Sequence, residues 1–443
     1  MVKVLIVGQG GRESSIAMRL AEDASVFAVM AHKNPTIEHF VQSSGGRYLI
    51  ATPTDSDAIS NFAEQNSIDL AFVSSDEPLA AGVVDALLAK GIRTVGPTRA
   101  GAQIEWDKEY AMNLMAQQFP AVTPKFWVVH DTSSLSMAIA EVRLSGLDIV
   151  VKPQGLTGGK GVKVMGAHLQ DLDAAHRYAQ ELLAERPSES VVLMEKVDGV
   201  EFTIMILTDG VSVVGAPATY DYPYRFEGDS GPGTGGMGAF SNSDQPLPFM
   251  SQAHYDECLD VAKGILKAMK EDGRRFNGVL NAGFFITKNG IKFLEFNARF
   301  GDPECMNIMT SIDSSLLALL EDIEAQKLTE QSVKFSGQAT VVKYLVTPEY
   351  ALEPGKKHDF SIDVGAIESK GLHVFFSAAV RNDAGGFSTV GNSRCVAIAA
   401  RGNTIPSAAA LVESAIQQYF SGPLQWREDV GAESYIDGLL RQQ

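Results

Sequence analysis

Around residue 297, three polar residues alternate with apolar ones along a predicted strand. Glu295, Asn297 and Arg299 should project from one face, because successive side chains of a strand point to opposite faces. The intervening side chains are expected to face the core: Leu294, Phe296 and Ala298. A carboxylate and an amide oxygen suit a divalent cation that bridges nucleotide phosphates, and a guanidinium suits a substrate carboxylate. A solvated strand face is the plainer alternative, which the Gly-Asp-Pro turn at residues 301–303 disfavours.

A glycine-rich loop follows a second predicted strand, which ends at Lys152. A lysine that closes a buried strand needs an anionic partner, because an unpaired buried charge is costly. Glycines allow backbone amides to approach and wrap a polyphosphate. The residues of this loop that suit such a role are Gly155, Gly158, Gly159, Lys160 and Gly161. The spacing differs from that of a P-loop, and taken alone the loop could be an ordinary turn.

Two further segments could complete a nucleotide and substrate site. The apolar strand at residues 191–197 turns polar at its end and could present backbone groups and Glu195 to an adenine and its ribose. An ordinary core strand with solvated ends is the alternative. Residues 227–238 contain six glycines in twelve positions, which excludes a helix or a central strand. Asp229, Pro232 and Met237 interrupt them, which favours a substrate-enclosing loop over a flexible linker.

Composition restricts the classes of partner. The formal net charge of −17 disfavours nonspecific binding to nucleic acid or to an anionic membrane. No apolar run approaches the roughly 20 residues that span a bilayer, and the start of the chain lacks the pattern of a signal peptide. The three cysteines fit neither a metal spacing nor a disulfide framework and are expected to be reduced. We therefore expect a cytoplasmic protein with no nucleic-acid or membrane partner.

The predicted elements indicate an α/β protein, α+β overall, with more than one domain. Strands at residues 2–7, 26–30, 70–73 and 94–95 alternate with helices such as 58–65 and 79–90, which predicts a parallel sheet within residues 1–100. Residues 101–330 mix helices and strands. The remainder, 331–443, is rich in strands (339–346, 373–379 and 395–399), with one late amphipathic helix at 407–420 and a short polar tail.

Together these motifs resemble those of the phosphoribosylamine–glycine ligases, a family of the ATP-grasp superfamily. The resemblance runs over essentially the whole chain and is most specific at residues 231–238 and 295–305. It implies an N-terminal α/β domain (1–100), an ATP-grasp domain (101–330) that includes a small mobile B domain (about 122–190), and a C-terminal β-rich domain (331–443). It also implies that ATP, with Mg²⁺ or Mn²⁺, drives the joining of glycine to 5-phospho-β-D-ribosylamine through glycyl phosphate. That reaction is the second step of de novo purine biosynthesis.

The resemblance also assigns roles to individual residues. The catalytic candidates are Lys152, Arg299 and Asp221. The residues expected at ATP are Lys108, Lys152, the loop glycines and Lys160 named above, Glu195, Lys196, Val197 and Glu201. Those expected to bind the metal ion are Glu295 and Asn297. Those expected at glycine or phosphoribosylamine are Arg299, Gly235, Gly236, Met237, Gly238, Gly10, Gly11, Arg12 and Glu13.

The chain departs from the family pattern at three places. Ser14 and Ser15 stand where His-Ala is common. The stretch Asp-Tyr-Pro-Tyr-Arg at residues 221–225 lacks the usual lysine. Gly283 occupies a position where some members carry a glutamine that adds a metal ligand. These departures concern the acceptor geometry and the number of metal contacts more than the ATP site.

Three other functions compete with this interpretation. The glycines at residues 8–11 after the first strand hint at a dinucleotide-binding oxidoreductase, but Glu13 replaces the third glycine and no ribose-binding acid follows the second strand. A regulatory ATP-binding protein derived from a ligase is a non-enzymatic alternative, which the intact Lys152, Glu295, Asn297 and Arg299 disfavour. An ATP-grasp ligase with another acyl donor is the nearest rival. The sequence gives only a weak preference for a monomer.

Overall fold

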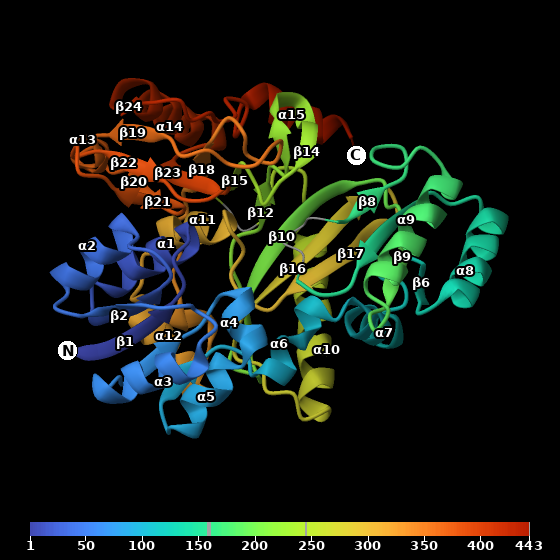
Figure 1. The fold of residues 1–443 in the computed structure, drawn as a ribbon, viewed down its shortest axis with the longest axis horizontal. Coiled ribbons are helices and arrows are strands. Elements are labelled where there is room, and N and C mark those ends of the chain that lie inside the picture. The colour runs from blue at the N-terminus through green and yellow to red at the C-terminus, as the bar shows by residue number, and fades with distance from the viewer. Residues whose placement is uncertain (157–160, 244–245, 443) are drawn as a thin grey trace.

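The computed structural model describes residues 1–156, 161–243 and 246–442. An N-terminal α/β body and a C-terminal body lie on one side of the molecule, and a small α/β body lies on the other (Figure 1). A long antiparallel sheet runs between them. Within the described ranges, no helix combines the length and the apolar character needed to cross a membrane.

The N-terminal body is a parallel sheet in the order β3-β2-β1-β4-β5. Alternate residues of β1 pack into separate core clusters, Val4 with Ile16 and Leu5 with Ile59, so helices cover both faces. Burial on both faces explains the nearly continuous apolar runs of these strands. The strands are β1 (Val2–Val7), β2 (Ala24–Met30), β3 (Tyr48–Ile50), β4 (Leu70–Phe72) and β5 (Arg93–Val95). The helices are α1 (Gly11–Leu20), α2 (Pro35–Ser43), α3 (Ser56–Gln65), α4 (Asp76–Ala81), α5 (Val83–Ala89) and α6 (Arg99–Trp106).

The single helix predicted at residues 79–90 is wrong. Gly82 adopts the left-handed conformation, with φ of 81°, and divides the segment into α4 and α5. Glycine reaches this conformation without the steric penalty that a side chain would meet, so it commonly ends a helix. Helix α4 begins shortly after β4, at Asp76, which borders the candidate site.

The small body is an antiparallel sheet in the order β6-β9-β7-β8 with its own core cluster. Helices α8 and α9 pack against each other and contribute apolar residues to that cluster. The elements are β6 (Phe126–Val129), α8 (Thr132–Ser145), β7 (Ile149–Pro153), β8 (Lys163–Val164), α9 (Leu172–Glu185) and β9 (Val191–Glu195). Helix α7 (Lys108–Gln118) connects this body to α6.

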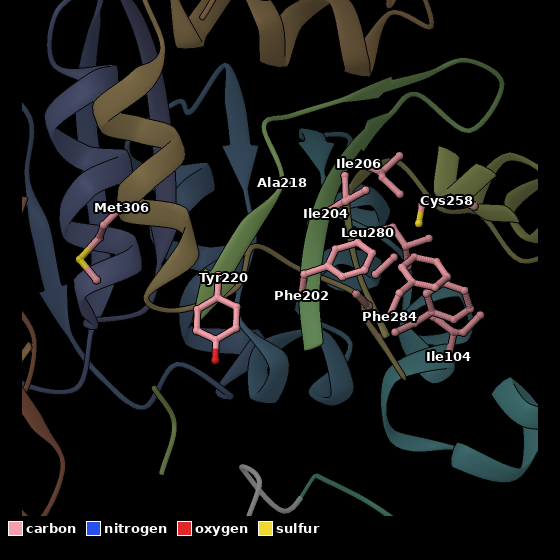
Figure 2. Packing of buried hydrophobic residues seen from close by; sticks show 14 of the residues in the cluster. Ile104, Phe202, Ile204, Ile206, Ala218, Tyr220, Cys258, Leu280, Phe284 and Met306 are labelled. Carbon is pink, nitrogen blue, oxygen red and sulfur yellow. The ribbon is translucent and has the colours of Figure 1, made fainter. Parts of the chain in front are cut away.

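The long sheet has the strand order β17-β16-β10-β12-β15-β18-β23-β20. It therefore extends from the centre of the molecule into the C-terminal body. Phe202, Ile204 and Ile206 point from β10 toward Cys258 and Phe284 (Figure 2). The strands of the long sheet are β10 (Val200–Thr208), β11 (Val213–Gly215), β12 (Thr219–Asp221), β15 (Gly238–Ser241), β16 (Gly278–Thr287), β17 (Gly290–Asn297), β18 (Ala339–Val346), β20 (His373–Phe376) and β23 (Arg394–Gly402). Strand β11 pairs with β10. Other elements between β12 and β18 are the hairpin β13 (Tyr224–Phe226) and β14 (Ser230–Gly233), α10 (Gln252–Glu271), α11 (Glu304–Ser311) and α12 (Leu316–Glu324).

The C-terminal body adds a second sheet in the order β21-β22-β19-β24. The predicted strand at 373–379 is interrupted after Phe376, where the chain leaves the long sheet and resumes as β21 in the other sheet. The predicted polar tail contains a further helix, α15, whose Ile436 and Leu439 are buried. The elements of this body are β19 (Asp359–Ile362), α13 (Val364–Glu368), β21 (Ala379–Arg381), β22 (Phe387–Thr389), α14 (Ile405–Tyr419), β24 (Phe420–Ser421) and α15 (Glu433–Arg441).

We expect the Phe284→Ala variant to lose about 3–5 kcal/mol of unfolding free energy, because removal of a buried aromatic ring leaves a cavity. The Phe284 ring is fully buried, with its centroid 6.0 Å from that of Phe202 and 6.2 Å from that of Phe293. Urea unfolding followed by circular dichroism measures the change. The matched control is Leu144→Ala, at a side chain that is 89% exposed, which should change stability by no more than about 0.5 kcal/mol. Equal losses in the two variants would contradict this description of the core.

Candidate functional site

A cleft of about 500 Å³ lies between the small sheet and the β10–β17 end of the long sheet. Strands β7, β8 and β9 contribute to one wall, and β10, β12, β16 and β17 contribute to the other. The cleft brings together many of the residues that the sequence singled out: Lys108, Lys152, Gly155, Lys196, Val197, Glu201, Asp221, Gly235, Glu295, Asn297 and Arg299.

The register of the antiparallel strands determines which side chains reach this cleft. Thr203 on β10 lies opposite Gly283 on β16, which lies opposite Glu295 on β17. In the next row, Asn281 lies opposite Asn297. Directly paired residues of an antiparallel sheet share a face, so these rows present their polar groups to one side. All five residues line the cleft.

Leu294 also lines the cleft, so its predicted place in the core is wrong. The pairing of β16 with β17 shifts register here: Gly283 pairs with Glu295, but the adjacent Phe284 pairs with Phe293. The extra residue is a β-bulge, which interrupts strict alternation of side chains. Phe293 is buried in place of Leu294, whereas Phe296 and Ala298 face the core as predicted.

Two lysines reach the cleft from the small body and its connecting helix. Lys152 is 5% exposed, and its Nζ donates a hydrogen bond to the Leu294 carbonyl at 3.1 Å. Lys108 Nζ donates to the Gly155 carbonyl at 3.1 Å. Burial lowers the pKa of both lysines, and the nearby Glu295 carboxylate opposes this shift. The protein therefore compensates the positive charge of each ammonium group only weakly, which suits both groups to an anionic ligand.

Arg299 is held by a buried carboxylate that the sequence analysis did not identify. Its Nη2 lies 3.2 Å from Glu105 Oε1 and donates to Asn297 Oδ1 at 3.2 Å. Glu105 also accepts the Ala298 N–H at 2.8 Å, which fixes the carboxylate beside the strand end. Burial acts to raise the pKa of Asp76, but the Arg299 and Arg12 guanidinium groups lower it below its ordinary value. Arg299 Nε is buried without a hydrogen-bond partner, so the guanidinium retains capacity for a ligand.

The cleft is rich in carboxylates, of which Glu304 is buried and Glu201 and Asp221 are half-buried. Glu201 and Asp221 lie across neighbouring strands, and Glu304 follows the Gly-Asp-Pro turn. Burial, together with the Glu295 carboxylate, raises the pKa of Glu201 to about 7. Burial and the proximity of Glu304 raise the pKa of Asp221 well above its ordinary value, and burial also raises that of Glu304. Because carboxylates outnumber cationic side chains among the lining residues, a polyphosphate bound here would need added positive charge.

The donor set fits a hard divalent cation. Glu295 offers an exposed carboxylate and Asn297 an amide oxygen, which are the ligand types that Mg²⁺ and Mn²⁺ accept. Asn281 Oδ1 and Thr203 Oγ1 are buried without hydrogen-bond partners in the same wall. Such unpaired acceptors are costly unless a ligand or cation satisfies them.

Several predicted site residues lie away from the cleft lining. The Glu195 carboxylate accepts the Lys125 N–H at 3.0 Å, and Met237 is fully buried in the core. Arg12 Nε and Glu13 Oε1 form a buried ion pair at 2.6 Å that braces α1. The remaining residues outside the lining are Gly10, Gly11, Gly161, Gly236 and Gly238. Gly158, Gly159 and Lys160 lie outside the described residues.

Residues at or beside two of the departures from the family pattern make packing contacts, whereas Gly283 lines the cleft. Ser14 Oγ donates to the Phe376 carbonyl at 2.6 Å, and Ser15 Oγ donates to the Arg12 carbonyl at 2.8 Å. Arg225 is buried, with Nη2 donating to Gln425 Oε1 at 2.7 Å and Nε donating to the Tyr350 carbonyl at 3.2 Å. The Ser14 contact ties α1, and the Arg225 contacts tie the β13 hairpin, to the C-terminal body.

Arg394 and Tyr344 form part of the site region although the sequence analysis did not single them out. Arg394 Nη1 donates to the carbonyls of Gly235, Gly236 and Asp302, the last at 2.6 Å. Tyr344 Oη donates to Asp302 Oδ1 at 2.7 Å, and the Arg394 guanidinium lies over the Tyr344 ring. The two C-terminal residues thus connect the glycine-rich loop to the turn at 301–303.

Comparisons with known proteins identify the family. The model of the phosphoribosylglycinamide synthetase N domain matches residues 2–105, and that of the ATP-grasp (A) domain matches residues 106–305. The phosphoribosylamine–glycine ligase of Thermococcus kodakarensis is 37% identical over 98% of this chain and 97% of its own. That of Pyrococcus furiosus is 37% identical over 100% of this chain and 97% of its own.

Solved structures share the fold. The crystal structure of phosphoribosylamine–glycine ligase from Thermotoga maritima has a TM-score of 0.78 at 20% identity and covers 97% of this chain and 100% of that chain. The biotin carboxylase domain of Hydrogenobacter thermophilus 2-oxoglutarate carboxylase, in complex with MgADP, has a TM-score of 0.72 at 14% identity and covers 98% and 95%. The predicted α/β class and ATP-grasp architecture are confirmed. Both family models and the full-length relatives show that this chain belongs to the phosphoribosylglycinamide synthetase family of ATP-grasp ligases.

Proposed function

We propose that this protein joins glycine to 5-phospho-β-D-ribosylamine with ATP, forming the glycinamide ribonucleotide, ADP and phosphate. The observation that carries the proposal is the convergence of Lys152, Glu295, Asn297 and Arg299 on one cleft. The full-length relatives are named for this ligase activity, which supports glycine and phosphoribosylamine as the substrates proposed for the cleft.

The chemistry requires activation of a carboxylate, which does not react with an amine at neutral pH. A glycine carboxylate oxygen attacks the γ-phosphorus of ATP, the bond to the β-phosphate oxygen breaks, and ADP leaves. The resulting glycyl phosphate is a mixed anhydride with a good leaving group. The sugar amine then attacks its carbonyl carbon and expels phosphate. No step needs a covalent bond to the protein, so positioning and electrostatic stabilisation can supply the catalysis.

The lysines and the strand β17 residues divide the tasks in this proposal. Lys108 and Lys152 neutralise negative charge on the phosphates, and their partly desolvated ammonium groups act more strongly than they would in water. Glu295 and Asn297 would hold Mg²⁺ or Mn²⁺, which adds positive charge beside the transferring phosphoryl group. Arg299, with Nε free of a protein partner, receives the glycine carboxylate and presents it for transfer.

The carboxylates that line the cleft suit the ammonium group of glycine. Glu304 lies near both Arg299 and Asp221, so the glycine ammonium group can bind to carboxylates while its carboxylate faces the guanidinium. Gly233, Thr234 and Gly235 also line the cleft. These loop residues help to exclude water, which would otherwise hydrolyse glycyl phosphate.

The direct test is ADP formation by the purified protein with Mg-ATP, glycine and freshly generated phosphoribosylamine, with each omitted in turn. We expect coupled turnover only when all three are present. The Lys152→Ala variant should lower kcat/KM about 100-fold, because one stabilising cation is lost from the transition state. ATP turnover that needs neither glycine nor the amine would contradict the proposal.

Lys292→Ala is the matched control for Lys152→Ala. Lys292 lies on β17 outside the cleft lining, where its Nζ donates to the Ala121 carbonyl at 2.7 Å. Its loss should leave turnover close to that of the unmodified enzyme. Near-normal turnover of Lys152→Ala would remove that lysine from the catalytic assignment.

The Arg299→Lys variant should raise the KM for glycine by about 10–100-fold and leave the KM for ATP nearly unchanged. Lysine keeps the charge but loses the planar pair of donors that binds a carboxylate, and a charged hydrogen bond contributes about 1.5–3 kcal/mol. Initial rates with each substrate varied in turn measure the effect. The control is Arg143→Lys, whose ion pair with Asp173 is exposed. An increase confined to the KM for ATP would assign Arg299 to the nucleotide instead.

A further inference from the structure

Asp302 stands at the point where the cleft meets the N-terminal and C-terminal bodies. It lines the cleft, and its side chain is 14% exposed. A Cβ placed on Gly10, the residue before α1, would lie 3.5 Å from Asp302 Oδ2. Such a Cβ would also lie 3.0 Å from Glu13 Oε2, so the lack of a side chain at Gly10 keeps the space between these two carboxylate oxygens clear of a side chain.

The two carboxylate oxygens of Asp302 have different surroundings. Oδ1 accepts a hydrogen bond from Tyr344 Oη at 2.7 Å and lies 3.3 Å from Arg394 Nη1. Among the described residues, the hydrogen bond and the ion pair of the Asp302 carboxylate both engage Oδ1, whereas Oδ2 faces Gly10. One oxygen is thus fixed by the C-terminal body, and the other is directed toward the space between α1 and the cleft.

The neighbours of this space favour a ligand that donates hydrogen bonds. Glu13 Oε2 accepts the Gly10 N–H at 2.7 Å, and the Ser377 hydroxyl lies 3.8 Å from the Cβ position at Gly10. Although Arg12 pairs with Glu13 and Arg394 with Asp302, Asp302 Oδ2 and Glu13 Oε2 present acceptor oxygens to this space, which an unprotonated phosphate cannot satisfy. An amine or a sugar hydroxyl, by contrast, can donate to them.

We propose that Asp302 binds the attacking amine of the acceptor and accepts its proton through Oδ2. As the amine nitrogen bonds to the glycyl carbonyl carbon, the bond from that carbon to the phosphate oxygen breaks. The nitrogen becomes cationic, and its proton passes to Asp302 Oδ2 and from there to solvent. Tyr344 and Arg394 are positioning residues, since they hold Oδ1 and so orient Oδ2. This inference rests on the proposed ligase function.

Hydroxylamine separates the two half-reactions, because this small nucleophile traps an acyl phosphate as a hydroxamate without needing an acceptor site. We expect Asp302→Asn to form glycyl hydroxamate from ATP, glycine and hydroxylamine at a rate within about threefold of the unmodified enzyme. Its ligation to phosphoribosylamine should fall about 100-fold, the usual contribution of a positioned general base. Tyr344→Phe should lower the rate of ligation by a smaller factor than Asp302→Asn, and it should likewise leave hydroxamate formation nearly unchanged.

The outcomes distinguish this inference from the function beneath it. Absence of hydroxamate with the unmodified enzyme would refute the glycyl phosphate and hence the proposed function. Equal loss of hydroxamate formation and ligation in Asp302→Asn would overturn the acceptor role and assign Asp302 to activation or to the fold. Thermal unfolding of each variant separates these last two explanations, because a structural defect would lower the melting temperature.

Discussion

The site depends on the hydrogen-bonded register of β10, β16 and β17. A shift of one residue would turn every side chain of a strand to the other face, and Glu295 and Asn297 would leave the cleft together. The long sheet fixes this register over many pairs, from Val200 with Ile286 to Thr208 with Gly278. The bulge at Leu294 modifies it locally by adding an apolar residue to the cleft wall. The positions of Glu295 and Asn297 are therefore set by the sheet rather than by a loop.

The same sheet explains how the C-terminal body contributes to the region of the cleft. Strand β15 follows the glycine-rich stretch and pairs with β18, which pairs with β23. Tyr344 and Arg394 come from these last two strands and reach the turn at Asp302. The contacts of Tyr344 and Arg394 matter because many carboxylates line the cleft. Their mutual repulsion must be opposed by Arg299, Arg394 and any bound cation. The proposed cation and substrates would compensate the charge that the protein side chains leave unbalanced in the cleft.

Local patterns predicted much of this arrangement. The alternation of Glu295, Asn297 and Arg299, and the lysine closing a strand at 152, indicated residues that the fold brings to one cleft. Leu294 was misplaced because a bulge depends on strand pairing, which alternation cannot express. A single helix was predicted at 79–90 because the pattern of apolar residues continues through Gly82, although the left-handed conformation of Gly82 divides the segment into two helices. Glu105, Asn281, Tyr344 and Arg394 carry no local signal, since their roles arise from contacts between segments distant in sequence.

The central claim is that the glycine carboxylate gives an oxygen to the phosphate that is released. Glycine labelled with ¹⁸O in both carboxylate oxygens tests it, with mass spectrometry of the phosphate formed during ligation. Attack of the carboxylate on the γ-phosphorus, followed by amine attack on the carbonyl carbon, predicts phosphate that carries one ¹⁸O and a product amide that carries the other. Phosphate without ¹⁸O, formed at the rate of ligation, would contradict glycyl phosphate as the intermediate and with it the assignment of this cleft to carboxylate activation.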